Sequence, residues 1–155
     1  MKSILINTCA IFFVSISVFA QNKDDIRNLD DHVAIEGYDP VAYFIENKAV
    51  EGKKQFAANI DGAIYYTSSE KNKEMLEKNP EKYQPQFGGW CAYAMGDDGS
   101  YLTINPKAYK IVDGKLYLFY KNIFSNTLKK WNKKETELMK DAKKNWKEKM
   151  KMKKQ

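Results

Sequence analysis

Two Asp-Gly dipeptides, each between two apolar runs, limit most strongly what this chain can fold into. They are Asp61-Gly62 and Asp113-Gly114. Asp-Gly in that setting is the strongest short signal for a β-hairpin, because both turn residues must tolerate a positive φ. The sequence therefore predicts hairpins over residues 55–67 and 109–120. The last strand, residues 115–120, has apolar or aromatic side chains on both faces, so we expect it to be covered on both sides.

Helical segments are expected after both hairpins. Ser68 or Ser69 can cap a helix that Asn79-Pro80 ends. Near the carboxyl end, mostly apolar side chains recur at spacings of three and four, which indicates one packing stripe on a helix. We therefore predict an α+β fold: a small antiparallel sheet built from hairpins, with packed helices and a long basic C-terminal helix. The stripe consists of Leu128, Trp131, Glu135, Leu138, Ala142, Trp146 and Met150.

The amino-terminal 20 residues have the pattern of a secretory signal peptide. Lys2 precedes an uncharged, largely apolar run over residues 4–19, and Val18 and Ala20 form a small-residue pattern before Gln21. We expect cleavage after Ala20 and export to the periplasm or the medium. A spanning helix needs roughly 20 apolar residues, so an uncleaved anchor is the alternative that the shorter run disfavours.

The rest of the chain is expected to form one domain. The full sequence has 43% hydrophobic and 14% aromatic residues, which excludes a fully disordered chain. We expect residues 21–31 to be loose, residues 32–150 to form a single domain that includes the C-terminal helix, and residues 151–155 to be frayed. No internal repeat of the solenoid type is evident.

Positive charge is concentrated at the carboxyl end. Residues 126–155 contain twelve lysines and four acidic residues, a local charge of +8, whereas residues 21–125 carry −3. Such a segment either forms a solvated helix face or binds an acidic partner, such as an anionic membrane or a cell-wall polymer. A nucleic acid is not the expected partner, because no nucleic-acid motif accompanies the lysines.

Several strings, in order, resemble the YHS domain, and within it the exported single-domain YHS proteins of bacteria. The first contains Gly37, Tyr38, Asp39 and Pro40, and a later one contains Gly88 and Gly89. The resemblance covers residues 33–146 and implies a small α+β domain with a short sheet. The strings are Gly37-Tyr38-Asp39-Pro40-Val41-Ala42-Tyr43-Phe44, Gly62-x-x-Tyr65-Tyr66, Asn79-Pro80-Glu81-Lys82-Tyr83, Pro85-Gln86-Phe87-Gly88-Gly89-Trp90-Cys91-Ala92 and Asp113-Gly114-Lys115-Leu116-Tyr117-Leu118.

The family is associated with metal handling through cysteines, and this chain departs from that pattern. The resemblance places the family's cysteines at Ala42, Ser68 and Asn72, and none of these can supply a thiolate. Soft ions such as Cu(I) need cysteine or methionine sulfur. The resemblance therefore implies that the usual metal site has been lost.

Cys91 is the one cysteine that remains after cleavage following Ala20. It is either a buried small apolar residue or a ligand or reactive thiol beside a pocket. Met95, four residues later, and the single histidine, His32, are the other candidate donors for copper or another soft transition metal. The many aromatic residues either fill the core or line a pocket. The candidates for such a pocket are Tyr43, Tyr65, Trp90 and Tyr93.

No catalytic motif is evident, and one histidine restricts acid–base chemistry near neutral pH. The first hypothesis is an exported, non-enzymatic binding protein that takes a soft metal or a small ligand near Cys91. The alternative is a structural or interaction module that docks on an anionic surface or partner through its lysine-rich C-terminal helix. A weaker alternative is a thiol redox role for Cys91.

Overall fold

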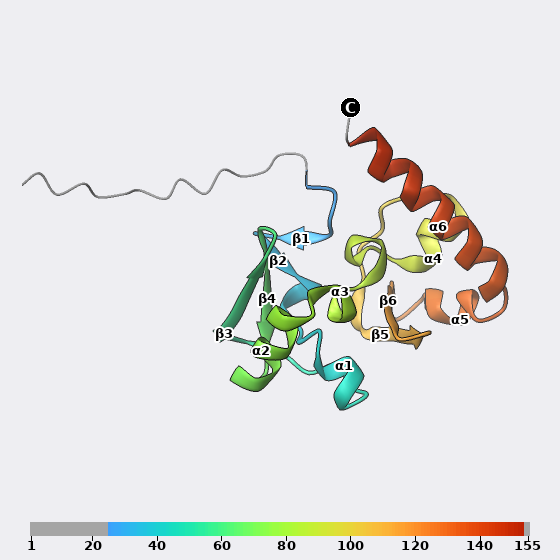
Figure 1. Ribbon diagram of the computed structural model, residues 1–155. Coiled ribbons are helices and arrows are strands. Elements are labelled where there is room, and N and C mark those ends of the chain that lie inside the picture. The colour runs from blue at the N-terminus through green and yellow to red at the C-terminus, as the bar shows by residue number, and fades with distance from the viewer. Residues whose placement is uncertain (1–24, 154–155) are drawn as a thin grey trace, which may run out of the picture.

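The computed structural model describes residues 25–153 (Figure 1). The expected signal peptide, residues 1–20, lies outside the described part of the chain. The strands are β1 (Leu29–Asp30), β2 (Val33–Ala34), β3 (Lys53–Ile60), β4 (Ala63–Thr67), β5 (Asn105–Val112) and β6 (Lys115–Phe119). The helices are α1 (Ala42–Ile45), α2 (Glu70–Lys78), α3 (Pro80–Tyr83), α4 (Ala92–Asp97), α5 (Thr127–Trp131) and α6 (Glu135–Met152), with short 3-10 turns η1 (Ile35–Gly37) and η2 (Gln86–Gly89).

The α+β class is confirmed, but the strands form two sheets instead of one. One has the order β1-β2-β4-β3, and β5 and β6 form the other. The expectation of a wholly antiparallel sheet is wrong at one pairing, because β2 runs parallel to β4 with Val33 opposite Ile64. The backbone N–H of Ile64 donates to the carbonyl of His32 at 2.8 Å. Hairpin signals report only local antiparallel pairs, so they could not reveal this long-range pairing.

Both predicted hairpins are confirmed. Asp61 and Gly62 have φ of 50° and 85°, and Asp113 and Gly114 have φ of 50° and 69°. Positive φ at both central residues defines the type I′ turn that Asp-Gly favours. Strand β6 is buried on both faces, as expected from its apolar alternation, with residues 116–119 nearly inaccessible.

The second half of the domain repeats the first at an offset of 52 residues. Each hairpin has a register shift at the same place, and the paired positions of β3 and β4 recur 52 residues later in β5 and β6. Lys53 pairs with Thr67, for example, as Asn105 pairs with Phe119. A turn and a short helix precede each hairpin, η1 with α1 and then η2 with α4, and a further helix follows each. Few side chains repeat, so the duplication is one of backbone geometry.

The two turns share an unusual left-handed backbone. Ile35 and Glu36 have φ of 54° and 51°, and Phe87 and Gly88 have φ of 55° and 60°. A β-branched or bulky residue rarely adopts positive φ, so Ile35 and Phe87 are held there by their surroundings. Both are buried. Each turn closes with the same hydrogen bond, in which the backbone N–H of an aromatic residue, Tyr38 or Trp90, donates to the carbonyl three residues earlier.

Residues 25–31, expected to be loose, are tied to the second half of the domain. The Trp90 indole N–H donates to the carbonyl of Ile26 at 2.6 Å, and the N–H of Asn28 donates to the carbonyl of Gly88 at 2.9 Å. Polar composition alone suggested a loose segment, but these backbone groups find partners in η2.

The lysine-rich end forms two helices, α5 and α6, which are separated by a turn between Trp131 and Glu135. The Trp131 indole is fully buried and donates to the Glu135 carboxylate at 3.1 Å. Lys110 on β5 pairs with the same carboxylate at 2.7 Å, and its hydrogen bond lowers the pKa of Glu135. Helix α6 then packs closely on α4, where an added Cβ on Gly96 would lie 2.5 Å from the carbonyl oxygen of Leu138. It continues to Met152, two residues beyond the expected end of the domain at residue 150. Among residues 25–153, no helix is both long and apolar enough to cross a bilayer.

Trp146 should anchor α6, while the lysines beside it should not matter for stability. Its half-buried indole lies against Gly88 and edge-on to Phe87, with ring centroids 6.4 Å apart. We expect Trp146→Ala to reduce the free energy of unfolding by about 2–3 kcal/mol, less than for a fully buried tryptophan. The control, Lys143→Gln with Lys147→Gln, should change it by no more than about 0.5 kcal/mol. Chemical denaturation measures both, and equal midpoints for Trp146→Ala and the parent would contradict this packing.

Candidate functional site

A buried carboxylate joins the two segments that the family resemblance singled out. Asp39 is fully buried. Its Oδ1 accepts hydrogen bonds from the N–H groups of Val41 and Ala42, at 2.8 and 3.3 Å. Its Oδ2 accepts three more, each of 2.7 Å, from the Ser68 N–H, the Ser68 hydroxyl and the Asn72 side-chain amide. Asp39 thus forms an Asx turn across Pro40, and also binds the start of α2, which the sequence did not indicate.

Local geometry explains why an acidic residue is stable at this buried position. Ser69 caps α2 through its hydroxyl, which accepts the Asn72 N–H at 3.2 Å, as predicted. Because Ser68 and Asn72 at the start of α2 donate to it, the Asp39 carboxylate lies at the positive end of this nine-residue helix. Five hydrogen bonds replace the water that the carboxylate loses on burial, and charge-assisted bonds of this kind are the strong ones.

The three positions to which the resemblance assigns metal-binding cysteines meet at this carboxylate. Ala42, Ser68 and Asn72 all contribute a donor to Asp39. Two of these donors are backbone N–H groups, and the others are a hydroxyl and an amide, which are poor ligands for soft ions. The residues present therefore do not fit the family's thiolate site, and hydrogen bonds to one carboxylate connect the same segments.

Removing this carboxylate should destabilise the domain strongly. Asp39→Ala leaves the buried N–H groups of Val41 and Ala42, and the half-buried N–H of Ser68, without an acceptor, and each buried group costs about 1–3 kcal/mol. We expect the free energy of unfolding to fall by at least about 3 kcal/mol. The matched control is Asp97→Ala, which removes an exposed carboxylate and should cost no more than about 0.5 kcal/mol. Similar unfolding midpoints for the two variants in urea would show that the Asp39 network is not important for stability.

Cys91 occupies the position in the second half that Asp39 occupies in the first. The N–H of Asp39 donates to Val50, and the N–H of Cys91 donates to Leu102, again 52 residues later. The Ser68 N–H donates to Asp39 Oδ2, and the equivalent N–H, that of Tyr120, donates to Cys91 Sγ at 3.3 Å. Cys91 is therefore the buried acceptor that connects the two ends of the second unit.

The proton of the Cys91 thiol can be assigned from its neighbours. The Thr127 hydroxyl donates its single proton to the Tyr120 carbonyl at 2.8 Å. Its contact with Cys91 Sγ, at 3.4 Å, therefore has the thiol as the donor. Cys91 is fully buried, and its sulfur both donates and accepts within the fold. This arrangement describes a structural thiol, with no face open to an incoming ligand.

The three candidate metal ligands lie on two separate elements: Cys91 and Met95 are one turn apart at α4, where the Met95 N–H donates to the Cys91 carbonyl at 3.0 Å, and His32 lies between β1 and β2. Cys91 belongs to the core cluster that includes Tyr43 and Leu116, whereas Met95 belongs to a second cluster around Trp131. His32 lies in the turn between β1 and β2 with a φ of 67°. Within residues 25–153, no set of three or more His, Cys, Asp or Glu side chains is placed to hold a metal ion.

The four aromatic candidates also lie in different surroundings. Tyr43 is in the core, where its hydroxyl donates to the carbonyl of Pro106 at 2.9 Å and burial raises its pKa. Tyr65, whose pKa burial also raises, lines a cavity with Trp146. Trp90 packs on Tyr101 with ring centroids 5.0 Å apart, and Tyr93 faces a different cavity. They therefore do not form one aromatic pocket.

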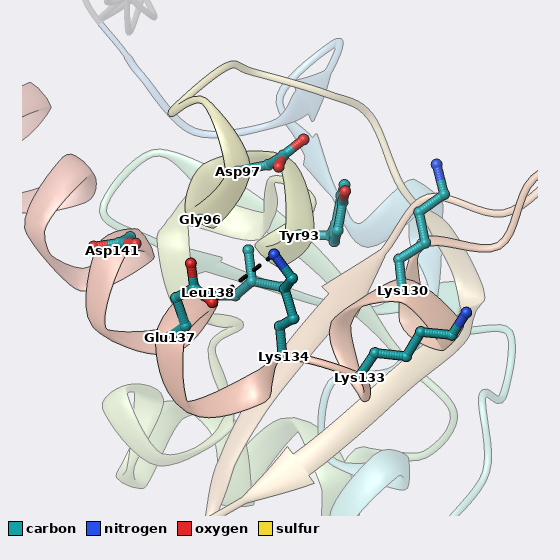
Figure 2. Close-up of a pocket in the computed structure, with 9 residues that line it drawn as sticks. All are labelled: Tyr93, Gly96, Asp97, Lys130, Lys133, Lys134, Glu137, Leu138 and Asp141. Carbon is teal, nitrogen blue, oxygen red and sulfur yellow. Dashed lines mark ion pairs between the residues drawn. The ribbon is translucent and has the colours of Figure 1, made fainter.

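The cavity at Tyr93 has a volume of about 260 Å³ and lies where α4 meets α5 and α6 (Figure 2). Lys134 is 4.0 Å from Glu137, and Lys130 lies over the Tyr93 ring at 5.6 Å. Partial burial, with the nearby Asp97 carboxylate, raises the pKa of Tyr93. Figure 2 shows the Lys130 and Lys133 side chains extending away from the carboxylates. The cavity is thus lined by balanced charge, and its unpaired cations point outward. Its lining is completed by Gly96, Leu138 and Asp141.

A row of lysines covers the exposed face of α6. The lysines recur at spacings of three and four residues along α6, which places them on the side opposite the buried Leu138 and Ala142. All five are exposed, and none forms an ion pair of 4 Å or less with another described residue. We call this row the basic stripe; it consists of Lys140, Lys143, Lys144, Lys147 and Lys151.

Acidic residues gather on the other side of the molecule. The charged residues that line an open cavity near β1, β2 and β3 are one lysine, Lys54, and four carboxylates, Asp30, Asp31, Glu36 and Glu51. Partial burial and the charge of Asp30 raise the pKa of Glu36. In Figure 1 the sheet with these strands and helix α6 lie on opposite sides of the molecule. The charge imbalance read from the sequence is therefore a separation of charge in space.

Comparisons with protein-family models, with curated proteins and with solved structures found no match for this chain.

Proposed function

We propose that the protein is a non-enzymatic interaction module that docks on an anionic surface through the basic stripe of α6. The observation that carries the proposal is the arrangement of five exposed lysines without ion-pair partners among the described residues. Like charges three and four residues apart repel and weaken a helix. A row of this kind is therefore not explained by stability, whereas an anionic partner would relieve the repulsion.

Charge separation supports the same proposal. The basic stripe faces one way, and the acidic cavity at Glu36 and Glu51 lies across the molecule. Near a negatively charged surface, such a molecule is oriented with α6 toward that surface and the acidic side away from it. Helix α6 also holds these lysines on a rigid support, because its opposite face is packed on the domain through the buried Leu138 and Ala142.

The readings centred on Cys91 have weaker support. A soft metal, a small ligand or a redox partner must reach the sulfur, but it is fully buried and hydrogen-bonded to Tyr120 and Thr127. Reactive cysteines sit in partly exposed surroundings, and structural ones are buried.

Membership of the YHS family and export from the cell are parts of the same proposal. The meeting of Ala42, Ser68 and Asn72 at one point supports the resemblance, because the family's metal ligands would have to be neighbours in space. Export is supported by the sequence pattern of residues 1–20 alone.

The stripe can be tested by removing charge at matched places. Lys140, Lys143, Lys144 and Lys147 are changed to Gln in one variant, and the exposed lysines Lys48, Lys54, Lys71 and Lys78 in the control. Each lysine near an anionic membrane contributes about 1 kcal/mol. We therefore expect the stripe variant to bind phosphatidylglycerol vesicles about 100-fold or more weakly, and the control much less so. The parent's binding should fade with added salt.

Sedimentation of vesicles measures this binding, with polyglutamate as a second, soluble polyanion. The stripe variant and the control variant have the same net charge. If both variants lose binding equally, on vesicles and on polyglutamate, then the overall charge matters and the stripe does not. That result would contradict the proposal.

A further inference from the structure

The loop between β6 and α5 presents two large apolar side chains to solvent. Ile123 and Phe124 are each 90% exposed, more than any other large apolar residue described. Every other Phe in the described chain is buried or half-buried. Adjacent apolar residues that are this exposed usually mark a place of interaction, because isolated exposure is common but paired exposure at a loop tip is not explained by packing.

The loop is held in shape by its own hydrogen bonds. The Asn122 side-chain oxygen accepts the N–H groups of Phe124 and Ser125, at 2.9 and 2.7 Å. The Asn122 N–H donates to the Ser125 carbonyl at 2.9 Å, and Lys121 and Asn126 pair as a β-bridge at the base. The tip is thus an Asx turn that displays Ile123 and Phe124 without needing them to fold.

Cations flank the tip on both sides along the chain. Lys121 forms one side of its base, and Asn126, on the other side, caps α5 by accepting the N–H of Lys129 at 3.3 Å. Lys129 and Lys130 are exposed on that helix, within two turns of the loop. An apolar tip with cations on both sides along the chain is complementary to a partner that has a negatively charged surface and an apolar interior.

We propose that this loop inserts Ile123 and Phe124 into the interfacial region of an anionic phospholipid bilayer. The inference rests on the proposed function, and it names the anionic surface as lipid. Lysines alone bind any polyanion equally well, whereas an apolar tip gains nothing from a polymer without an apolar phase. A single aromatic and a single aliphatic side chain reach only the boundary of the acyl chains, so binding is peripheral and reversible.

The test compares loop variants of the full chain, so that residues 1–24 are common to all of them. Ile123→Ser with Phe124→Ser should lower partitioning into phosphatidylglycerol vesicles by about tenfold or more. The matched control is Ile45→Ser, which removes an isoleucine that is 50% exposed on α1 and should leave partitioning unchanged. The unfolding midpoint of the tip variant should equal that of the parent, because Ile123 and Phe124 are each 90% exposed.

A second readout locates the tip directly. In Phe124→Trp, tryptophan fluorescence should shift to the blue on anionic vesicles and be quenched by brominated acyl chains. The parent's tryptophans, Trp90, Trp131 and Trp146, are wholly or partly buried in the fold and should be quenched much less.

The outcomes separate the inference from the proposed function. If Phe124→Trp is not quenched and the loop variant binds like the parent, insertion is wrong, while lysine-dependent, salt-sensitive vesicle binding would still support docking by the basic stripe. If only polyglutamate is bound, the partner is not lipid and the inference is overturned. If binding to both probes is independent of the lysines, both proposals fail.

Discussion

The rest of the structure depends on the hydrogen bonds to one buried carboxylate. Asp39 accepts five of them and so holds the turn before α1 against the start of α2, across 29 residues of chain. A carboxylate without these partners would be very costly to bury, and with them it fixes one arrangement of the two segments. The second unit makes the same connection with Cys91, whose thiol accepts the N–H of Tyr120. The weaker acceptor is supplemented by the Thr127 hydroxyl, which lies 3.4 Å from the Cys91 sulfur.

The Asp39 carboxylate and the Cys91 sulfur both form hydrogen bonds within the fold, so the candidate interaction sites lie on the surface. Groups with reactive chemistry, the Asp39 carboxylate and the Cys91 thiol, serve structural roles within the described residues. The surface instead carries the basic stripe on α6 and the apolar tip at Ile123 and Phe124. Both are held on elements that are rigid for other reasons, the packing of α6 on α4 and the Asx turn at Asn122. Docking through them requires no opening of the interior.

Local signals in the sequence predicted local structure well. The Asp-Gly turns, the Ser69 cap and the opposed apolar and lysine faces of α6 each follow from neighbouring residues. Long-range features could not be predicted in this way. Positive φ at Ile35 contradicts its intrinsic preference and exists only because tertiary packing holds it. The 52-residue duplication is hidden because it repeats hydrogen-bonded positions with unlike side chains, as Asp39 and Cys91 show. The exposure of Ile123 and Phe124 was not predicted, because apolar side chains by themselves favour burial.

The central claim is that a carboxylate network stabilises the segments that metal ligation would hold in the family that the sequence resembles. It is tested most directly by measuring the free energy of unfolding of the protein in urea with a strong chelator, and again with added zinc or Cu(I). Binding of a structural metal contributes its free energy to folding, so a chelator would unfold a domain that depends on one. We predict the same unfolding curve under all three conditions, because Ala42, Ser68 and Asn72 offer no thiolate and Asp39 already accepts five hydrogen bonds. A large loss of stability with the chelator, restored by the metal, would contradict the account.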